Sequence, residues 1–505
     1  MEKTLTRKNK FILNTVSSIL NQFITIICGF VLPRNMLLFF GSEINGMVSS
    51  ITQFLNFISF LQFGVGTVIH ASWYRPLSDN NYQKISQIYV SAQKFFRKIA
   101  LIFLLYTLFT IVFYTVFMDT KQNDIYISSL ILVIAFSLFT QYFWGITNSL
   151  LLNADQKGYI PLMLSSIITL LNTIISLLLM YNGQSILIVK LGSTIVHLVN
   201  PIILSLYVNK CYKINKKIEF IGEPIRQKWN GFAQHVSAVI VDNTDIIVLT
   251  ILSTLENVSI YSVYHMVVAS MKNLIMSLTH GIQALFGNML ARGEIEKLKD
   301  VFNRFELFLS FIITFFYTCT SCLVVPFIEV YTQGVNDISY KEPYFAILLT
   351  IAYAIFGYRT IYYTLIKAAG HFKETQQSAI IEAILNLVIS IVCVIHLGLI
   401  GVAIGTLIAM IYRTFYCVWY LSKNIIRRNI REFIFNMFVN MCIYVVSFQL
   451  SHFFELSIVT YFSWIILALK VGILNFVVCV CAYIIAYPKR FIQVRNFIIY
   501  QFIKH

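Results

Sequence analysis

Five ionisable side chains lie deep inside long apolar segments of the 505-residue chain: Asp242, Asp245, Lys272, Arg359 and Arg413. A charge in such a segment is costly, so each is a candidate for lining a water-filled cavity, and a structural ion pair is the alternative. Asp242 and Asp245 are three residues apart and therefore share one face of a helix. Lys272 lies about 20 Å along the next expected helix, where it could meet Asp242.

Other charges lie nearer the ends of apolar segments. Arg34 follows Pro33 at the end of the first segment. Lys190, Glu306 and Glu382 lie close enough to an end for their side chains to reach the membrane surface, which favours snorkelling. We therefore expect Arg34, Lys272, Arg359 and Arg413 to be the cations available to a substrate.

No pattern of catalytic residues accompanies these charges. The sequence contains no zinc-ligand spacing, P-loop, nucleophile elbow or Ser/His/Asp ordering. Cys319 and Cys322 have CxxC spacing but lack the strand-to-helix context of a redox motif. Histidines in the apolar segments, such as His197, are expected to be neutral and hydrogen-bonded to a neighbour. We expect no enzyme, no cofactor and no metal site, so uphill work must draw on an ion gradient, the membrane potential or consumption of the product.

The composition places the charges in a membrane. Hydrophobic residues make up 58% of the chain and charged residues only 12%, whereas a soluble domain averages about 25% charged residues. A membrane-spanning helix needs about 20 mostly apolar residues. Runs of this kind predict fourteen spans, near 12–32, 45–69, 99–118, 126–149, 161–181, 186–208, 231–252, 259–288, 305–328, 344–366, 378–396, 401–421, 433–452 and 459–486. The expected fold is an all-α integral membrane protein with about fourteen transmembrane helices.

The distribution of charge predicts the topology. With both termini in the cytoplasm, cytoplasmic segments hold thirty Lys and Arg residues, and the outer loops hold three, Arg34, Lys121 and Lys341. This bias follows the positive-inside rule. It accounts for the net charge of +16 without nucleic acid as a partner. The first apolar run has the length of a span and no small-residue cleavage pattern, so we expect no cleavable signal peptide.

A basic cytoplasmic segment, 82–96, is predicted to form an amphipathic helix on the inner membrane surface. Its apolar residues recur at helical spacing: Tyr82, Ile85, Ile88, Tyr89, Ala92 and Phe96.

The first twelve spans divide into two similar sets of six. A shift of 213 or 214 residues brings them into weak register, for example 171–176 with 385–390. Six is even, so the two repeats are parallel in the membrane, an arrangement found in transporters whose two lobes rock against each other around a substrate path. We expect an N-lobe at 1–213, a C-lobe at 214–427 and two additional spans at 428–505.

The chain resembles the bacterial polysaccharide repeat-unit flippases of the multidrug/oligosaccharidyl-lipid/polysaccharide exporter superfamily. The resemblance extends over nearly the whole chain, through the six, six and two arrangement of spans and several short motifs. These motifs are Leu32-Pro33-Arg34, Gly41-Ser42-Glu43-Ile44-Asn45-Gly46, Phe63-Gly64-Val65-Gly66, Tyr74-Arg75-Pro76-Leu77, Asn243-Thr244-Asp245-Ile246-Ile247-Val248 and Ser259-Ile260-Tyr261-Ser262.

The resemblance implies that the chain moves an undecaprenyl-pyrophosphate-linked oligosaccharide from the inner to the outer leaflet of a bacterial cytoplasmic membrane. The product would enter capsule, O-antigen or exopolysaccharide assembly, with a polymerase and glycosyltransferases as partners. Physical chemistry agrees, because a pyrophosphate cannot cross hydrocarbon without cations and guanidinium groups bind it bidentately. Asp242 and Asp245 are then candidates for gating and for coupling to H⁺ or Na⁺, with an Arg34–Asp245 pair closing the outer mouth and an Asp245–Lys272 bridge as the structural alternative.

Three other functions compete with this one. A cation-coupled drug or small-molecule antiporter of the same superfamily would favour twelve spans and an acidic cavity. A membrane acyltransferase would need a His/Asp or Glu pair beside a catalytic loop at the membrane surface. A scaffold without transport activity would not need charges buried at mid-membrane.

Overall fold

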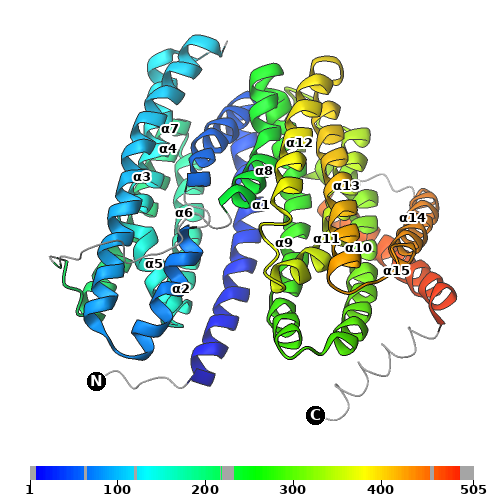
Figure 1. Cartoon of the computed structure of the whole chain (residues 1–505). Helices are drawn as coiled ribbons and strands as arrows, with labels where there is room; N and C mark the ends of the chain where they lie inside the picture. Colours follow the sequence, from blue (N-terminus) through cyan, green and yellow to red (C-terminus); the bar gives the residue numbers. More distant parts are fainter. Residues whose placement is uncertain are drawn as a thin grey trace. The chain divides into compact units, whose positions relative to one another are not determined.

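The computed structural model of the chain describes residues 7–61, 65–118, 122–216, 218, 232–454 and 460–488. Throughout these residues the secondary structure is helical, with turns and no strand (Figure 1). The chain forms two compact units, Met1–Val239 and Ile240–His505, and the boundary falls within one helix, α8. The predicted all-α class is confirmed. The predicted division at 1–213, 214–427 and 428–505 stays a prediction.

Before α8, the described residues of the first unit form seven α-helices, with a short 3₁₀-helix and a π-helical turn between them. Their bounds are α1 (Arg7–Phe57), η1 (Ile58–Leu61), α2 (Val65–Ser78), α3 (Tyr82–Phe117), α4 (Asp124–Thr140), η2 (Gln141–Gly145), α5 (Ile146–Ala154), α6 (Tyr159–Tyr181) and α7 (Ile186–Cys211). The helix α8 (Phe232–Leu252) then leads into the second unit.

Two predicted spans, 12–32 and 45–69, meet differently from expectation. The structure has no loop between them, because α1 continues through a sharp bend at Gly41, where φ is 77°. This left-handed backbone conformation is accessible to glycine at little cost. The second predicted span also does not continue as one helix to residue 69, since α1 ends at Phe57 and is followed by η1.

The predicted surface helix at 82–96 is part of a longer element. The segment and the span after it form the single 36-residue helix α3, which begins at an N-cap where the Asn81 side chain accepts a hydrogen bond from the Lys84 backbone N–H at 3.0 Å. The predicted apolar face is correct from Ile85 onward, since Ile85, Tyr89 and Phe96 are buried, but Tyr82 at its start is exposed. The separate surface helix was wrong, because no helix-breaking residue separates the segment from the span.

A polar cluster ties together the expected inner ends of three elements of the first unit. Lys157 Nζ lies 2.8 Å from an Asp155 carboxylate oxygen, and Lys10 Nζ donates to the Asp155 backbone carbonyl at 3.1 Å. The Tyr212 hydroxyl donates to the same carboxylate. Burial, and then this hydrogen bond, raise the pKa of Tyr212 well above its usual range. The cluster therefore holds the start of α1 and the end of α7 against the α5–α6 turn.

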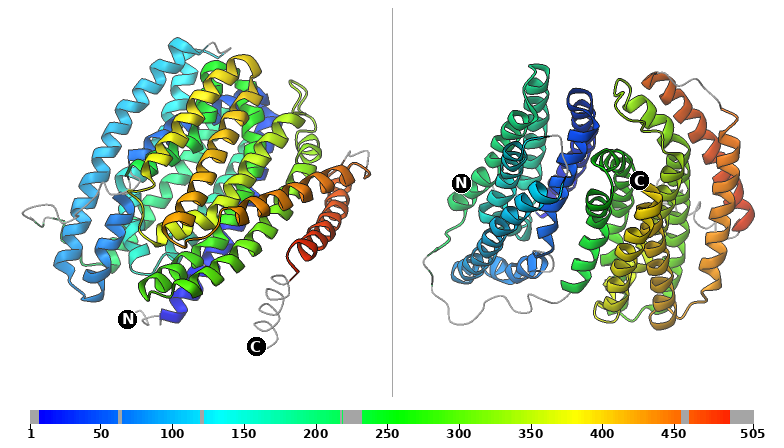
Figure 2. Two further views of the ribbon diagram at one scale, coloured as in Figure 1. Left: turned by 45° about the vertical axis from the view of Figure 1, so that its right-hand side comes forward. Right: turned by 90° about the horizontal axis from the view of Figure 1, so that it is seen from above.

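The second unit consists of α8 and seven further helices. Their bounds are α9 (Leu255–Ala291), α10 (Ile295–Tyr331), α11 (Pro343–Ala368), α12 (Gln376–Leu397), α13 (Leu399–Asn424), α14 (Arg431–Ser451) and α15 (Tyr461–Ala486). The last two pack against each other and against α10, at one flank of this unit (Figure 2).

Eleven helical segments in the described part of the chain are long and apolar enough to span a membrane. One of them, Ile12–Phe57, contains the first predicted span and most of the second. The helices α8 and α9 are not among the eleven, and both carry charged residues near their centres, Asp242 and Asp245 in α8 and Lys272 in α9. The chain is a multi-pass membrane protein. The candidate residues Asp242, Asp245 and Lys272 lie on α8 and α9.

The interpretation of Glu306 as a snorkelling residue was wrong. Its carboxylate is buried in α10 and accepts hydrogen bonds from Arg428 at 2.5 Å, from Asn436 at 3.2 Å and from Tyr362. Arg428 lies just before α14, and Asn436 lies within it. A buried carboxylate is stable only when it is paired and hydrogen-bonded, and this network attaches the C-terminal helices to the rest of the unit.

Candidate functional site

The second unit brings Arg359 and Arg413 to one carboxylate. Arg359 from α11 forms a hydrogen-bonded ion pair with Glu382 of α12, and Nε of Arg413 from α13 lies 3.6 Å from the other oxygen of Glu382. All three side chains are at most 10% exposed. Arg413 also donates to the Thr375 carbonyl at 2.9 Å. Two cations around one anion leave a net positive charge in a buried place.

The interpretation of Glu382 as a snorkelling residue was therefore wrong as well. A signal for its true role is present in the sequence. Arg359 and Glu382 lie eleven residues before and twelve residues after Gly370, which is in the turn between α11 and α12. Two residues equally far from a helical hairpin turn lie at the same depth, so their pairing could have been found by the reasoning that related Lys272 to Asp242.

Lys272 pairs with Asp242 as the sequence suggested. Its Nζ lies 2.6 Å from the Asp242 carboxylate, between α9 and α8. The Asp242 side chain is 51% exposed and the Lys272 side chain 17% exposed. An Asp245–Lys272 bridge, the structural alternative considered above, is not what the second unit contains. Lys272 and Asp242 are the most exposed of the ion-paired side chains in the site.

An aromatic ring joins the lysine to the arginine pair. The ring of Phe356 in α11 lies 4.8 Å from Lys272 Nζ and 4.8 Å from the Arg359 guanidinium carbon, measured to the ring centroid. Cations at this distance from a ring are attracted to its electron-rich face. Three of the four predicted substrate-binding cations, Lys272, Arg359 and Arg413, therefore form one cluster, which we call the cation cluster.

Asp245 lies in a separate buried group that four helices build. Its Oδ2 accepts hydrogen bonds from the Tyr261 hydroxyl of α9 at 2.9 Å and from the Thr406 hydroxyl of α13 at 2.7 Å. Asn386 of α12 donates to Thr406 at 3.1 Å. We call Asp245, Tyr261, Asn386 and Thr406 the Asp245 cluster. Sequence reasoning found only the aspartate, because neutral polar residues in a span give no charge signal.

Some oxygen atoms of the Asp245 cluster accept no hydrogen bond from the described residues. In the described part of the chain, Asp245 Oδ1 and Asn386 Oδ1 are buried and have no hydrogen-bond partner, and the same holds for Ser390 Oγ. The close packing of α13 on α12 depends on Gly405, because a Cβ there would lie 2.2 Å from Ser390 Oγ. Oxygen atoms are the ligands that hard cations such as Na⁺ prefer, and a proton would equally satisfy a carboxylate oxygen.

Arg34, the fourth predicted cation, is in the first unit. It lies in α1, one residue after Pro33 and seven residues before the bend at Gly41, and its side chain is half-buried. The second unit thus gathers three predicted cations and both predicted aspartates, whereas the first unit contributes Arg34 alone.

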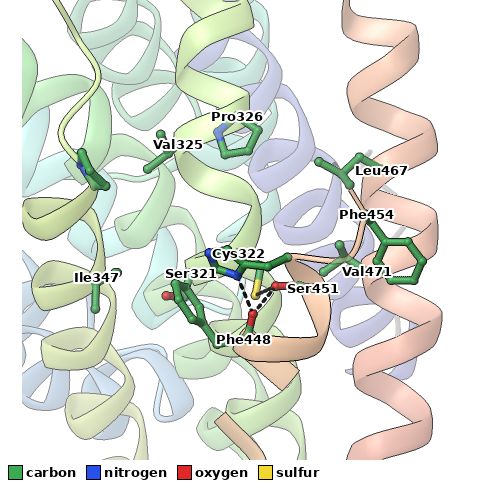
Figure 3. A pocket seen from close by; sticks show the side chains of 12 residues that line it. Ser321, Cys322, Val325, Pro326, Ile347, Phe448, Ser451, Phe454, Leu467 and Val471 are labelled. Atoms are coloured by element: carbon green, nitrogen blue, oxygen red, sulfur yellow. Dashed lines mark hydrogen bonds between the residues drawn. The ribbon is translucent and has the colours of Figure 1, made fainter. Parts of the chain in front are cut away.

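A cavity of about 290 Å³ lies elsewhere in the second unit, where α10 and the start of α11 meet α14 and α15 (Figure 3). Its walls are mostly apolar, and the Ser451 hydroxyl donates to the Cys322 sulfur at 3.3 Å. None of its lining residues is Lys, Arg, Asp or Glu. The cavity therefore lacks the charges that would attract a pyrophosphate.

No protein-family model matches the sequence, and no curated protein sequence matches it. Several solved structures do match the fold. A lipid II flippase, MurJ, in an inward closed conformation has a TM-score of 0.70 and 17% identity, and the match covers 94% of this chain and 99% of that chain.

Two MATE transporters match less of the chain, and the first is described as a multidrug resistance transporter. An inward-facing MATE family transporter of the MOP superfamily has a TM-score of 0.62 and 11% identity, and the match covers 80% of this chain and 94% of that one. The Vibrio cholerae MATE transporter VcmN, as a D35N mutant, has a TM-score of 0.58 and 14% identity, with 83% and 98% covered. The chain has the same fold as these transporters, and this is the fold that the resemblance implied.

Proposed function

We propose that the chain is a flippase for undecaprenyl-pyrophosphate-linked oligosaccharide repeat units. It would move them by alternating access from the inner to the outer leaflet of a bacterial cytoplasmic membrane, for capsule, O-antigen or exopolysaccharide assembly. The observation that carries the proposal is the buried cation cluster of the second unit. A net positive charge among Lys272, Arg359 and Arg413 suits an anionic head group and disfavours a cationic drug.

The extent of the structural likeness supports the same choice. The MATE transporter matches are nearly complete on the transporter side but leave about a fifth of this chain uncovered. The flippase match leaves only 6% uncovered. A chain with two more helices than a twelve-helix antiporter would give this result. Both termini are proposed to lie in the cytoplasm, and a polysaccharide polymerase and glycosyltransferases are the proposed partners.

The cations are proposed to bind the pyrophosphate in two ways. Lys272 is the more open residue, so the head group would contact it after displacing the Asp242 carboxylate. Arg359 and Arg413 are held by Glu382, and their shared positive charge would attract the head group while their geometry stays fixed. Guanidinium groups suit this role because their planar forks match phosphate oxygens. Arg34 is proposed to supply a further cation from the first unit.

Asp245 is proposed to couple transport to an ion. Its partner-free Oδ1 and that of Asn386 would take a proton or share a Na⁺ ion. Ion binding there changes the charge of a buried group, and it can shift the balance between two states if the ion binds one state more tightly. The Arg34–Asp245 gate belongs to this proposal, with Asp245 exchanging its Tyr261 and Thr406 hydrogen bonds for the arginine in one state.

A vesicle assay tests the function. The purified chain would be placed in liposomes that contain a fluorescent short-chain polyprenyl-pyrophosphate disaccharide, and an impermeant quencher would report the fraction in the outer leaflet. We expect the chain to let all of the probe reach the quencher, whereas protein-free liposomes protect about half. Protection equal to that of protein-free liposomes, together with ion-driven efflux of a cationic dye, would replace the flippase with the antiporter.

A further inference from the structure

The helix α7 of the first unit has two opposite faces. One carries exposed apolar residues at helical spacing, as expected for contact with lipid: Ile188, Leu191, Ile195, Val199, Ile202 and Leu206. On the other face, Ile186 is buried at the start of the helix, and Pro201, Leu204 and Val208 are buried in its C-terminal half. Residues 190, 193 and 197 continue this second face, because they follow Ile186 at steps of four, three and four residues.

These three residues are polar and are not fully buried. Lys190 and Ser193 are half-buried and His197 is exposed, although the residues above and below them on the same face are packed against the unit. The face that carries them is turned away from the apolar face. This face of α7 is therefore accessible between about 6 Å and 16 Å from the start of the helix, at 1.5 Å per residue.

The charge in this opening is not neutralised. Within the described ranges of the chain, Lys190 has no ion pair and neither Lys190 nor His197 has a hydrogen bond. A cation held inside an apolar protein without a counter-charge is costly. The favourable partner for it is an anion that reaches this face of α7, and snorkelling is a poor alternative for a residue on the face opposite the lipid-facing one.

The helix α7 packs against a stretch of irregular backbone. The Thr194 hydroxyl of α7 donates to the Val133 carbonyl of α4 at 2.8 Å, and α7 also packs against the π-helical turn η2 that follows α4. In that turn the Gln141 amide folds over Gly145, where a Cβ would lie 2.4 Å from Gln141 Oε1. Turns of this kind inside α-helices occur frequently at functional sites.

We infer that Lys190, Ser193 and His197 form a second anion-binding site, which takes a carboxylate of an acidic sugar in the transported glycan. The inference rests on the proposed function and names its substrate class. The pyrophosphate is assigned to the cation cluster of the second unit, so the anion left for Lys190 is one carried by the glycan, and a sugar carboxylate supplies the single charge that matches one lysine. Ser193 and His197 supply the hydrogen bonds that hold a sugar carboxylate or a neighbouring hydroxyl.

The experiment measures equilibrium binding to the full chain in lipid nanodiscs. The probes are a hexuronate-containing tetrasaccharide, the matching tetrasaccharide in which glucose replaces the uronate, and inorganic pyrophosphate. The variants are Lys190→Gln, Lys190→Arg and, as a matched control, Lys470→Gln, which removes an exposed lysine of α15. Thermal unfolding of each variant checks that it is folded.

The inference predicts that Lys190→Gln weakens binding of the acidic tetrasaccharide at least tenfold, while Lys190→Arg and Lys470→Gln bind it within twofold of the wild type. The neutral tetrasaccharide should bind the wild type at least tenfold more weakly than the acidic one, and pyrophosphate should bind Lys190→Gln and wild type equally. Equal binding of the acidic probe by Lys190→Gln and wild type overturns the inference. So does a loss that affects pyrophosphate as strongly as the uronate. Binding of the acidic probe without lipid flipping in vesicles would leave this site standing and remove the proposed function.

Discussion

The two units share buried polar positions, but only the second unit adds a carboxylate to them. At a shift of 214 residues, Asn172 and Ser176 of α6 correspond to Asn386 and Ser390 of α12, and Val31 corresponds to Asp245. Both asparagines are buried, and so are both serines. The second unit adds a carboxylate to this polar pattern, whereas the first unit lacks one there and has Lys190 on the next helix.

This difference makes the two units suitable for different ligands. A buried carboxylate with partner-free oxygens is suited to a cation, and an unpaired lysine is suited to an anion. The second unit also compensates its cations, since Glu382 and Asp242 each hold at least one of them. We therefore propose that the second unit holds both the coupling ion and the substrate pyrophosphate, and that Lys190 of the first unit is left for a further anionic group of the substrate.

The largest effect is expected from breaking the compensation in the second unit. Glu382→Ala leaves Arg359 and Arg413 buried without their shared anion. Removing one partner of a buried ion pair costs about 3–5 kcal/mol. The thermal midpoint of the detergent-solubilised protein should therefore fall sharply. Glu374→Ala, at an exposed position in the preceding turn, is the control and should leave the midpoint unchanged. An unchanged midpoint for Glu382→Ala would show that the two arginines have other compensation.

Asp245→Asn sharpens the assignment of ion coupling. The amide cannot carry a charge, so stabilisation by Na⁺ or by low pH should disappear. Wild-type protein with Na⁺ at 100 times its dissociation constant should gain about 2.7 kcal/mol, seen as a higher thermal midpoint, and Asp245→Asn should gain none. Asp337→Asn, in the loop between α10 and α11, serves as the control and should respond as the wild type does. A wild-type ion response in Asp245→Asn would move the ion site elsewhere.

The gate between the units is tested by a charge swap. Arg34→Asp and Asp245→Arg should each reduce export of surface polysaccharide, and the double variant should recover part of it if the two residues pair in one state. Protein abundance in the membrane is measured alongside, so that misfolding is separated from loss of transport. Failure of the double variant to recover any export, at normal abundance, would leave Asp245 with its ion-binding role only.

Depth and charge made part of the site predictable from the sequence. Lys272 and Asp242 were paired from their distances to a shared hairpin turn, and Arg359 and Arg413 were selected because charges in spans are rare. Glu306 and Glu382 were misread, because distance from a span end does not reveal which neighbours a side chain meets.

Neutral residues mark a second limit of the sequence. The Asp245 cluster is completed by Tyr261, Asn386 and Thr406, which come from three different helices. Such residues are also common in ordinary helix packing. Their role follows only from where the folded helices place them. The sequence did not predict that one helix bends at Gly41, because glycine is common in loops and a helix can nevertheless continue through it.

The cation cluster is proposed to bind the pyrophosphate of the substrate, and substitution of Lys272 is the sharpest test of this role. In vesicles, the flipping rate of the fluorescent pyrophosphate-linked disaccharide would be compared among wild type, Lys272→Gln, Lys272→Arg and the control Lys470→Gln. We expect at least a tenfold loss for Lys272→Gln, which corresponds to about 1.4 kcal/mol, substantial activity for Lys272→Arg, and wild-type activity for Lys470→Gln. Equal flipping rates for wild type and a correctly folded Lys272→Gln would show that the cluster does not bind the pyrophosphate.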